Sequence, residues 1–336
     1  MSSEKKKIIL SGIRPTGKLH LGHWVGALSN WIELQEEYKC FFMAADWHAF
    51  MSEYKNSSTI KKSIRDNISD WLAYGVNPEK SVVFIQSEVP EHLELYIILS
   101  ALVPLGWLYR CPTFKEQVAQ LKDKDINTHA FLGYPVLQSA DILLYKANFV
   151  PVGEDQLPHL ELCREIIRRF HFIYKRKVFI EPKGLLTSVP RFLGLDGRKM
   201  SKSYNNCIEL CEEPESLKRK ILSMFTDPAR KKRNDPGHPD VCNVFDYYSI
   251  FGSVSGKSSK NLSEVKKECI EAKKGCRECK EELIKILEAF IAPHREEKKN
   301  ILKKKHYLRN VLDEGAEYAR KCARQTLNEV KEALKL

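Results

Sequence analysis

The sequence predicts an α/β fold, with a Rossmann-like parallel-sheet domain followed by a smaller C-terminal helical domain. Short apolar runs alternate with amphipathic stretches from Lys5 to about Phe172, as strands and helices do in parallel sheets. A glycine-rich turn directly follows the first of these runs, and after residue 205 the chain is mainly helical and rich in lysine. We therefore expect a sheet domain over residues 1–205, continued by part of the C-terminal helix over 310–336, and a helical domain over 206–310.

Length and charge limit the class of protein. The 336 residues are enough for two domains. Lys and Arg total 55 against 44 Asp and Glu, which gives a net charge of +11 and a pI near 9.0. This excess fits an anionic partner, although charge alone also serves solubility. No apolar run approaches the roughly 18 residues of a membrane helix and Met1–Lys7 does not begin a signal peptide, so we expect a cytoplasmic protein with no membrane partner.

The first expected strand is the apolar run Ile8–Leu10, and the stretch Ser11–Gly26, SGIRPTGKLHLGHWVG, follows it. Its glycines let the backbone come close to phosphate groups, and a helix is expected to start near His20–His23. Backbone N–H groups at a helix start point at an anion, and two imidazoles there can donate hydrogen bonds to a triphosphate. The stretch is therefore a candidate nucleotide site.

Three other interpretations of this stretch are open. The segment Gly12–Lys18 has the spacing of a P-loop up to its lysine, but Leu19 has no hydroxyl group to hold a magnesium ion. His20 and His23 can also be ordinary surface histidines. As a metal-binding pair they have no third ligand nearby in the sequence.

The next elements continue the alternation of strand and helix. Cys40–Ala45 is expected to be a buried strand, Ser57–Tyr74 an amphipathic helix capped by a serine, and Ser81–Gln86 a third strand. Parallel strands with right-handed crossovers bind ligands at their carboxyl ends. Asp46–His48 follows the second strand and therefore lies at this edge, as does the glycine-rich stretch.

A helix over Tyr134–Tyr145 carries the most informative polar residues after the opening stretch. Tyr134, Gln138 and Asp141 are spaced i, i+4 and i+7, which places them on one face of a helix that is otherwise apolar. Taken alone, this is also the pattern of a half-exposed helix. A carboxylate in so apolar a neighbourhood needs a hydrogen-bond donor, which an indole N–H or a phenol can supply.

A second basic stretch lies far down the chain. The segment Lys199–Ser203, KMSKS, is flanked by Gly194 and Gly197, which is typical of a mobile loop. By itself it can be a solvated lysine loop.

The region beyond this loop is basic and mainly helical. It contains the basic run Arg230–Arg233 and expected helices over Lys280–Lys305 and Leu308–Leu334. These segments suit contact with RNA phosphates, or simply present a solvated face.

Ten cysteines in a chain expected to be cytoplasmic indicate thiols or a metal centre rather than disulfides. Four of them have the spacing C-x26-C-x6-C-x2-C: Cys242, Cys269, Cys276 and Cys279. Four thiolates with this spacing can close on one zinc ion or on one [4Fe–4S] cluster.

Several of these motifs together resemble a known family. HLGH and KMSKS are similar to the two hallmark motifs of class I aminoacyl-tRNA synthetases. SGIRPTGKLHLGH, YPVLQSADILLYKA, the segments Val150–Gln156 and Leu312–Ala316, and KMSKS all resemble the bacterial-type tryptophanyl-tRNA synthetases. The resemblance implies a Rossmann catalytic domain, a helical domain that meets the tRNA anticodon, a homodimer, and tRNA(Trp), L-tryptophan and ATP as partners, with no DNA. The alternatives are a tyrosyl-tRNA synthetase and a non-catalytic RNA-binding paralogue.

The resemblance also assigns residues to the tryptophan and nucleotide sites. It makes Asp141 the group that reads the indole N–H, with a surrounding pocket of Tyr134, Gln138, Gln156 and His48. Catalysis would depend on His20, His23, Lys199 and Lys202. ATP would be contacted by a larger set: Arg14, Pro15, Thr16, Gly22, His23, Gly153, Glu154, Asp155, Phe192, Lys199, Met200, Ser201, Lys202 and Ser203.

The implied chemistry is two successive transfers. The tryptophan carboxylate attacks the α-phosphorus of ATP and expels pyrophosphate with Mg²⁺, so that negative charge builds on the leaving group. Lys199 and Lys202 supply the opposite charge when their loop closes. A terminal ribose hydroxyl of the tRNA then attacks the carbonyl of the adenylate and forms the ester.

Three departures from the family pattern are visible. Arg14 and His23 stand where many bacterial members carry glutamine and asparagine, and both keep hydrogen-bond donors. Gln117, in Phe114–Gln117, stands where relatives often have a second pyrophosphate-binding lysine. The resemblance leaves Lys115 and Arg14 as the two candidates to replace that contact. Some tryptophanyl-tRNA synthetases carry a four-cysteine [4Fe–4S] site with x6 and x2 gaps, so the resemblance favours iron–sulfur over zinc for the four cysteines.

Overall fold

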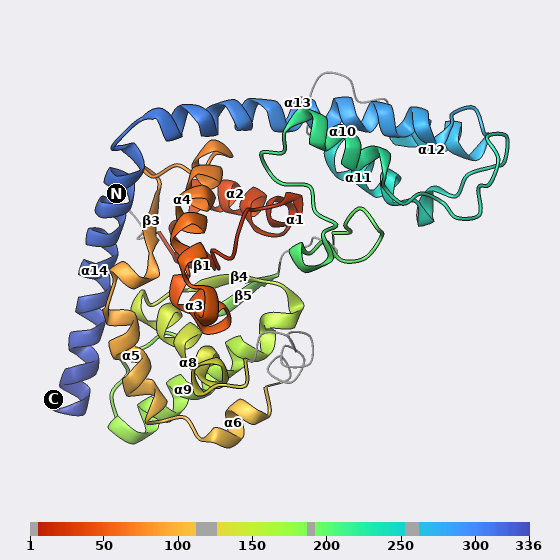
Figure 1. The fold of residues 1–336 in the computed structure, drawn as a ribbon. Coiled ribbons are helices and arrows are strands. Elements are labelled where there is room, and N and C mark those ends of the chain that lie inside the picture. The colour runs from red at the N-terminus through yellow and green to blue at the C-terminus, as the bar shows by residue number, and fades with distance from the viewer. Residues whose placement is uncertain (1–5, 112–125, 187–191, 253–261) are drawn as a thin grey trace, which may run out of the picture. The chain divides into compact units, whose positions relative to one another are not determined.

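The chain folds around a five-stranded parallel sheet in the order β3-β2-β1-β4-β5 (Figure 1). The structure is a computed structural model, and it describes residues 6–111, 126–186, 192–252 and 262–336. The strands are β1 (Ile8–Ile13), β2 (Lys39–Ala44), β3 (Ser81–Ile85), β4 (Phe149–Val152) and β5 (Lys183–Leu186). This order and the parallel pairing confirm the predicted Rossmann-like sheet.

Contacts within the chain divide it into two units. The first comprises residues 1–18, 27–188 and 304–336 and the second comprises 19–26 and 189–303. The second unit thus begins earlier in the sequence than the predicted helical domain over 206–310, and it includes the turn that carries HLGH. The functional domain limits remain a prediction. Within the described ranges, every helix is too short or too polar to cross a membrane.

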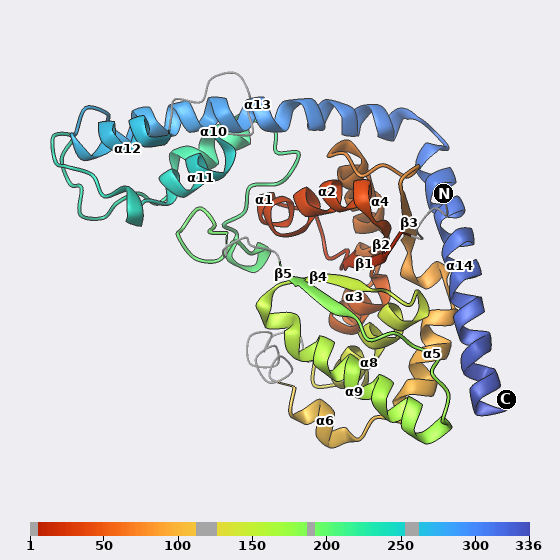
Figure 2. The same ribbon diagram turned by 180° about the vertical axis from the view of Figure 1, so that it is seen from behind.

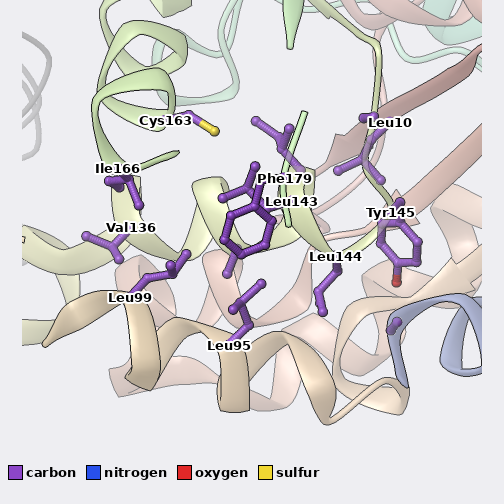
Figure 3. Packing of buried hydrophobic residues seen from close by; sticks show 14 of the residues in the cluster. Leu10, Leu95, Leu99, Val136, Leu143, Leu144, Tyr145, Cys163, Ile166 and Phe179 are labelled. Carbon is purple, nitrogen blue, oxygen red and sulfur yellow. The ribbon is translucent and has the colours of Figure 1, made fainter. Parts of the chain in front are cut away.

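Helices cover both faces of the sheet in the first unit. Figures 1 and 2 show α2 and α4 on one face and α8 and α9 on the other. The helices of this unit are α2 (Ser29–Glu37), α3 (Asp46–Glu53), α4 (Ser58–Ala73), α5 (Glu91–Ser100), α6 (Leu105–Tyr109), α8 (His129–Leu144), α9 (Leu157–Tyr174) and α14 (Tyr307–Leu334). The face covered by α8 and α9 holds a large apolar core, which is drawn close up in Figure 3.

Two local expectations are corrected. Strand β1 continues through Ile13, so Gly12 lies in the strand instead of in the turn; a Cβ atom on it would come 2.9 Å from the Met43 carbonyl oxygen of β2. Helix α4 begins after Ser57, as expected, but the Ser57 side chain makes no capping hydrogen bond. Its end is as predicted, because Gly75 takes the left-handed conformation there, with φ of 110°.

The C-terminal helix α14 covers the outer edge of the sheet. It packs along β3, and a Cβ atom on Gly315 would lie 1.9 Å from the carbonyl oxygen of Val83. Such a distance is far inside contact range, so glycine is required there for the helix to approach the strand this closely. The helix thereby blocks a strand edge that could otherwise pair with another chain.

The second unit is a small helical assembly. Its longer helices are α10 (Pro214–Leu222), α11 (Asn243–Phe251), α12 (Leu262–Ile270) and α13 (Cys276–Lys303), in addition to the short α1 (Leu21–His23). Helices α10 and α11 pack along α13 (Figure 2). Buried rings of Phe192, Tyr247, Phe251 and Phe290 form its core, with successive ring centroids 4.6 to 6.2 Å apart.

We predict that Gly315→Ala lowers the stability of the fold. Alanine is intrinsically better than glycine in a helix by about 0.5–1 kcal/mol, but the added methyl group overlaps the Val83 carbonyl, and such overpacking costs about 1–3 kcal/mol or more. The midpoint of thermal unfolding should therefore fall. The matched control is Gly106→Ala in α6, where a Cβ atom meets nothing within 4 Å. An unchanged midpoint for Gly315→Ala would contradict the close packing of α14 on β3.

Candidate active site

A cavity of about 350 Å³ opens at the carboxyl edge of the sheet in the first unit. It lies where the strand order reverses, between β1 and β4, and both strands line it through residues such as Ser11 and Pro151. This is where open parallel sheets bind ligands. Its volume falls in the range of small-molecule sites.

All five residues assigned to tryptophan by resemblance line this one cavity. Tyr134, Gln138 and Asp141 reach it from the predicted face of α8, while His48 comes from α3 and Gln156 from the turn after β4. The structure thus brings together residues that are more than one hundred positions apart in the sequence. Their individual roles remain a prediction.

Asp141 is a buried carboxylate with three protein donors. Its Oδ1 atom lies 2.6 Å from His92 Nδ1, its Oδ2 atom lies 2.9 Å from His48 Nε2, and Gln86 Nε2 donates to both oxygens at 2.8 and 3.0 Å. Burial opposes ionisation, but the two histidines outweigh it and lower the pKa of Asp141 to about 2. The expectation that a ligand must supply the donor is therefore incomplete, because the protein already supplies three.

His92 and Gln86 were not found from the sequence. His92 is a single histidine in α5, a helix whose sequence is otherwise largely apolar. Gln86 directly follows β3, and the strand-end rule that singled out Asp46–His48 applies to it equally. The strand-end rule could therefore have identified Gln86 from the sequence. No sequence pattern marked His92.

A second buried histidine, His159 of α9, organises the other polar groups of the cavity. Its Nε2 atom lies 2.9 Å from the Tyr134 hydroxyl, and its Nδ1 atom lies 3.1 and 3.2 Å from the amide oxygens of Gln138 and Gln156. Burial lowers the pKa of His159 to about 4, so the ring is neutral at pH 7. Because amide oxygens only accept, the proton lies on Nδ1 and the Tyr134 hydroxyl donates to Nε2.

The loop after β1 is held in place by α4. Gly17 has a φ of 99°, and its N–H donates to Ser63 Oγ at 2.9 Å. Arg14 lines the cavity, whereas Pro15 is buried and Thr16 is partly buried. Ser63 was not anticipated from the sequence.

The turn after β4 carries the other residues of the first unit that the resemblance assigns to ATP. Glu154 and Asp155 are exposed, and a Cβ atom on Gly153 would lie 2.7 Å from an Asp155 carboxylate oxygen. Glycine thus lets the Asp155 carboxylate approach the backbone closely.

In the second unit, the HLGH turn and the KMSKS loop lie against each other. Leu21 N–H donates to the Ile208 carbonyl at 2.9 Å, just beyond the loop. A Cβ atom on Gly22 would meet the His20 ring at 3.0 Å and the Met200 sulfur at 3.6 Å. The two motifs, almost 180 residues apart in the sequence, therefore share one site within this unit.

Both histidines of the turn are neutral at pH 7. Burial, with a further contribution from the Lys202 ammonium group, lowers the pKa of His20 to about 4. Burial also lowers the pKa of His23 well below its usual value, and His20 and Lys202 act in the same direction. His23 Nδ1 accepts the backbone N–H of His20 at 3.1 Å, so its proton lies on Nε2. A neutral ring with this proton can donate to an anion without carrying a charge itself.

The KMSKS loop is anchored by one buried amide, Asn206. Its oxygen accepts the Ser201 N–H at 2.8 Å, and its nitrogen donates to Asp196 at 2.7 Å and to the Lys199 carbonyl at 3.2 Å. A Cβ atom on Gly194 would come 2.3 Å from the Asn206 side chain, so glycine is needed for this contact. Asn206 was missed from the sequence because no motif marks it and two of its three partners are backbone groups.

The lysines of the loop, Lys199 and Lys202, are both exposed to solvent. Phe192 is buried against Tyr247, and its carbonyl accepts the Met200 N–H at 3.1 Å. The contact with ATP that the resemblance assigns to Phe192 would therefore use its backbone N–H. The side chain of Ser203 lies outside the described residues. The same holds for the whole segment Phe114–Gln117. Within the described part of the chain, His20 and His23 have no third metal ligand.

The four cysteines of the predicted metal site line one small cavity in the second unit, between α11, α12 and α13. Arg230 Nη1 lies 3.9 Å from Cys269 Sγ and 4.0 Å from Cys276 Sγ. Burial raises the pKa of Cys279 to about 12, so this thiol is neutral unless a metal displaces its proton. Among the described residues, no three or more His, Cys, Asp or Glu side chains are grouped so that they could hold a metal ion.

The comparisons with known proteins agree with this arrangement. The family model described as "tRNA synthetases class I (W and Y)" matches residues 2–292. The chain is 49% identical to the tryptophan–tRNA ligase of Thermotoga maritima over 329 residues, which cover 98% of this chain and 99% of that protein. It is 40% identical to the tryptophan–tRNA ligase of Aquifex aeolicus, again with 98% and 99% covered.

Solved structures give the same picture. The crystal structure of a tryptophanyl-tRNA synthetase from Campylobacter jejuni, complexed with ADP and tryptophan, matches with a TM-score of 0.87 and 32% identity, over 98% of this chain and 100% of that chain. A tyrosyl-tRNA synthetase from Archaeoglobus fulgidus, complexed with L-tyrosine, matches with a TM-score of 0.67 at 21% identity, which is a likeness of fold alone.

Proposed function

The chain belongs to the class I tRNA synthetases of the tryptophan and tyrosine family, and we propose that it is a tryptophan–tRNA ligase whose first unit binds the amino acid in the cavity above β1 and β4. It activates L-tryptophan with ATP, releases pyrophosphate, and transfers tryptophan to the 3′ end of tRNA(Trp). The observation that carries the assignment is the ionised Asp141 in a cavity lined by all five residues of the family's tryptophan site.

Asp141 suits the recognition of an indole ring. An ionised carboxylate can only accept hydrogen bonds, so it favours a ligand that brings an N–H or O–H donor. Tyrosine also brings a donor, and the carboxylate alone does not distinguish the two amino acids. The relatives decide between them, because the proteins that are 49% and 40% identical over nearly the whole chain are tryptophan–tRNA ligases.

Tyr134, Gln138 and Gln156 would hold the polar end of the amino acid. Because the Tyr134 proton points to His159, the Tyr134 oxygen presents a lone pair to the cavity. That lone pair can accept from the α-ammonium group of tryptophan. The carboxylate of tryptophan is then left to react with ATP.

The family resemblance assigns ATP contacts to residues of each unit by itself. Residues of the first unit in this role are Arg14, Pro15, Thr16, Gly153, Glu154 and Asp155, and those of the second unit are His20, Gly22, His23, Phe192, Lys199, Met200, Ser201, Lys202 and Ser203. The neutral His23 donates through Nε2, while the two lysines add positive charge as pyrophosphate forms. Bound Mg²⁺ would neutralise further charge on the phosphates. Intact histidine and lysine motifs count against a non-catalytic RNA-binding paralogue.

The tRNA would be met by the second unit. Lys231, Lys232 and Arg233 are exposed next to the four-cysteine cavity, and exposed cations of this kind bind RNA phosphates. An ester then forms when the terminal ribose hydroxyl attacks the adenylate carbonyl. The enzyme would act in the cytoplasm, where charged tRNA is used.

The four cysteines would hold a [4Fe–4S] cluster, with Zn²⁺ as the alternative. Cys242, Cys269, Cys276 and Cys279 supply the four thiols that either group needs and line the same cavity, where the guanidinium of Arg230 would offset the negative charge of bound thiolates. The x6 and x2 gaps of the iron–sulfur variety of the family favour the cluster. Such a centre would fix the ends of α12 and α13 relative to α11.

The enzyme would act as a homodimer. The exposed apolar side chains Ile97, Leu105, Tyr109 and Phe172 come from α5, α6 and α9, which all pack against α8, and Phe172 is 72% exposed. Exposed apolar side chains on neighbouring helices are candidates for an association surface. The solution mass measured by light scattering should be twice the 38.9 kDa of one chain, and Phe172→Glu should reduce it. A single-chain mass for the unaltered protein would contradict the dimer.

We predict that tryptophan, and not tyrosine, supports exchange of labelled pyrophosphate into ATP, and that Lys202→Ala slows this exchange by about 10²–10³-fold. The reason is that Lys202 would offset charge that develops on the leaving pyrophosphate. The control is Lys183→Ala, which removes an exposed lysine on β5. Exchange with tyrosine alone would refute the proposed substrate, and normal exchange by Lys202→Ala would remove Lys202 from its role.

We predict that the anaerobically purified protein is brown and contains about four iron and four sulfide per chain. Cys276→Ser should lose the colour and the iron, whereas Cys322→Ser, which alters a partly buried cysteine of α14, should keep both. Colourless protein with one zinc per chain would instead establish the alternative.

A further inference from the structure

Behind Asp141, on the side away from the cavity, lies a buried chain of hydrogen bonds. Asp141 and His48 line the cavity, but His92 does not. His92 is fully buried, with one ring nitrogen 2.6 Å from Asp141 Oδ1 and the other 2.8 Å from the Tyr145 hydroxyl. The chain therefore runs from Tyr145 through His92 to the carboxylate.

The partners place the protons along this chain. Burial raises the pKa of the Tyr145 phenol well above its usual value, so Tyr145 keeps its proton. Among the described residues, His92 Nε2 is the acceptor within reach of that proton. Tyr145 therefore donates to Nε2, which leaves the ring proton of His92 on Nδ1, where it is donated to Asp141.

The same side of Asp141 is closed by Gln86. Its amide nitrogen donates to both carboxylate oxygens, while its own oxygen is buried without a hydrogen-bond partner among the described residues. An orphaned buried oxygen is costly, so the amide orientation is set by the charge on Asp141. Rotation of the amide would turn its oxygen toward the carboxylate and repel it.

The donors matter because the charge state of Asp141 decides what it can recognise. A buried carboxyl group without donors takes up a proton, and a neutral carboxyl can donate as well as accept. A neutral Asp141 would then no longer disfavour the binding of a ligand that lacks the indole N–H. An ionised carboxylate held in one orientation keeps that penalty, because such a ligand leaves an acceptor unpaired.

We propose that His92 and Tyr145 form a donor relay that holds Asp141 ionised and fixed, and that His92 is thereby a positioning residue for tryptophan specificity. This inference rests on the proposed function. The relay begins and ends on helix α8, since Asp141 and Tyr145 are one turn apart, and α5 supplies the histidine between them. Glu91, the residue before His92, is in turn paired with Arg324 of α14 at 2.7 Å, and this ion pair fixes the start of α5.

The test compares tryptophan with its sulfur isostere β-(benzothiophen-3-yl)alanine, which has the same shape but no N–H. The measured quantity is the ratio of kcat/KM for the two amino acids in ATP–pyrophosphate exchange. We expect His92→Leu to lower this ratio by about 10–100-fold, through a higher KM for tryptophan with the KM for ATP unchanged. Tyr145→Phe should lower it less. His92→Asn should restore most of it, because the asparagine amide can donate from the place of Nδ1.

The control is His171→Leu, which removes a partly buried histidine of α9 that accepts the Phe179 N–H at 3.2 Å and does not line the cavity. Its ratio should match that of the unaltered enzyme. A purely structural role for His92 would lower kcat/KM equally for both amino acids and leave the ratio unchanged, and this result would overturn the relay. An unaltered enzyme that fails to prefer tryptophan would instead refute the proposed function.

Discussion

The whole amino-acid site depends on keeping one negative charge in an apolar interior. Asp141 is buried, and burial by itself favours the neutral acid. Donors from three separate elements reverse this preference: His48 after β2, Gln86 after β3, and His92 in α5. The parallel sheet makes the arrangement feasible, since it brings the ends of its strands to one edge where a carboxylate on α8 can meet them.

The nucleotide motifs solve the opposite electrostatic problem. Burial first, and the nearby Lys202 ammonium group second, disfavour a positive charge on His20 and His23, and both rings are consequently neutral. Under the proposed function, the turn would donate hydrogen bonds to phosphates while the positive charge stays on the exposed lysines of the loop.

The sequence predicted those parts of the site that have a local pattern. The spacing of Tyr134, Gln138 and Asp141 fixed their common helix face, and the ordered strands fixed the edge where ligands bind. It did not reveal His92 or His159, because all but one of the partners described above lie 21 to 53 residues away in the sequence and neither histidine is marked by periodicity or by a motif. The predicted serine cap of α4 also failed, since the Ser57 side chain makes no capping hydrogen bond.

The position of α14 against β3 has a consequence for how the protein is made. More than two hundred residues separate the strand from the helix that covers it, and most of the second unit, residues 189–303, is synthesised in between. At roughly 5–20 residues per second, the ribosome needs on the order of 10–40 s for that stretch. During this time the nascent sheet has an open lateral border, so we expect the emerging polypeptide to depend on chaperones until its last helix leaves the exit tunnel.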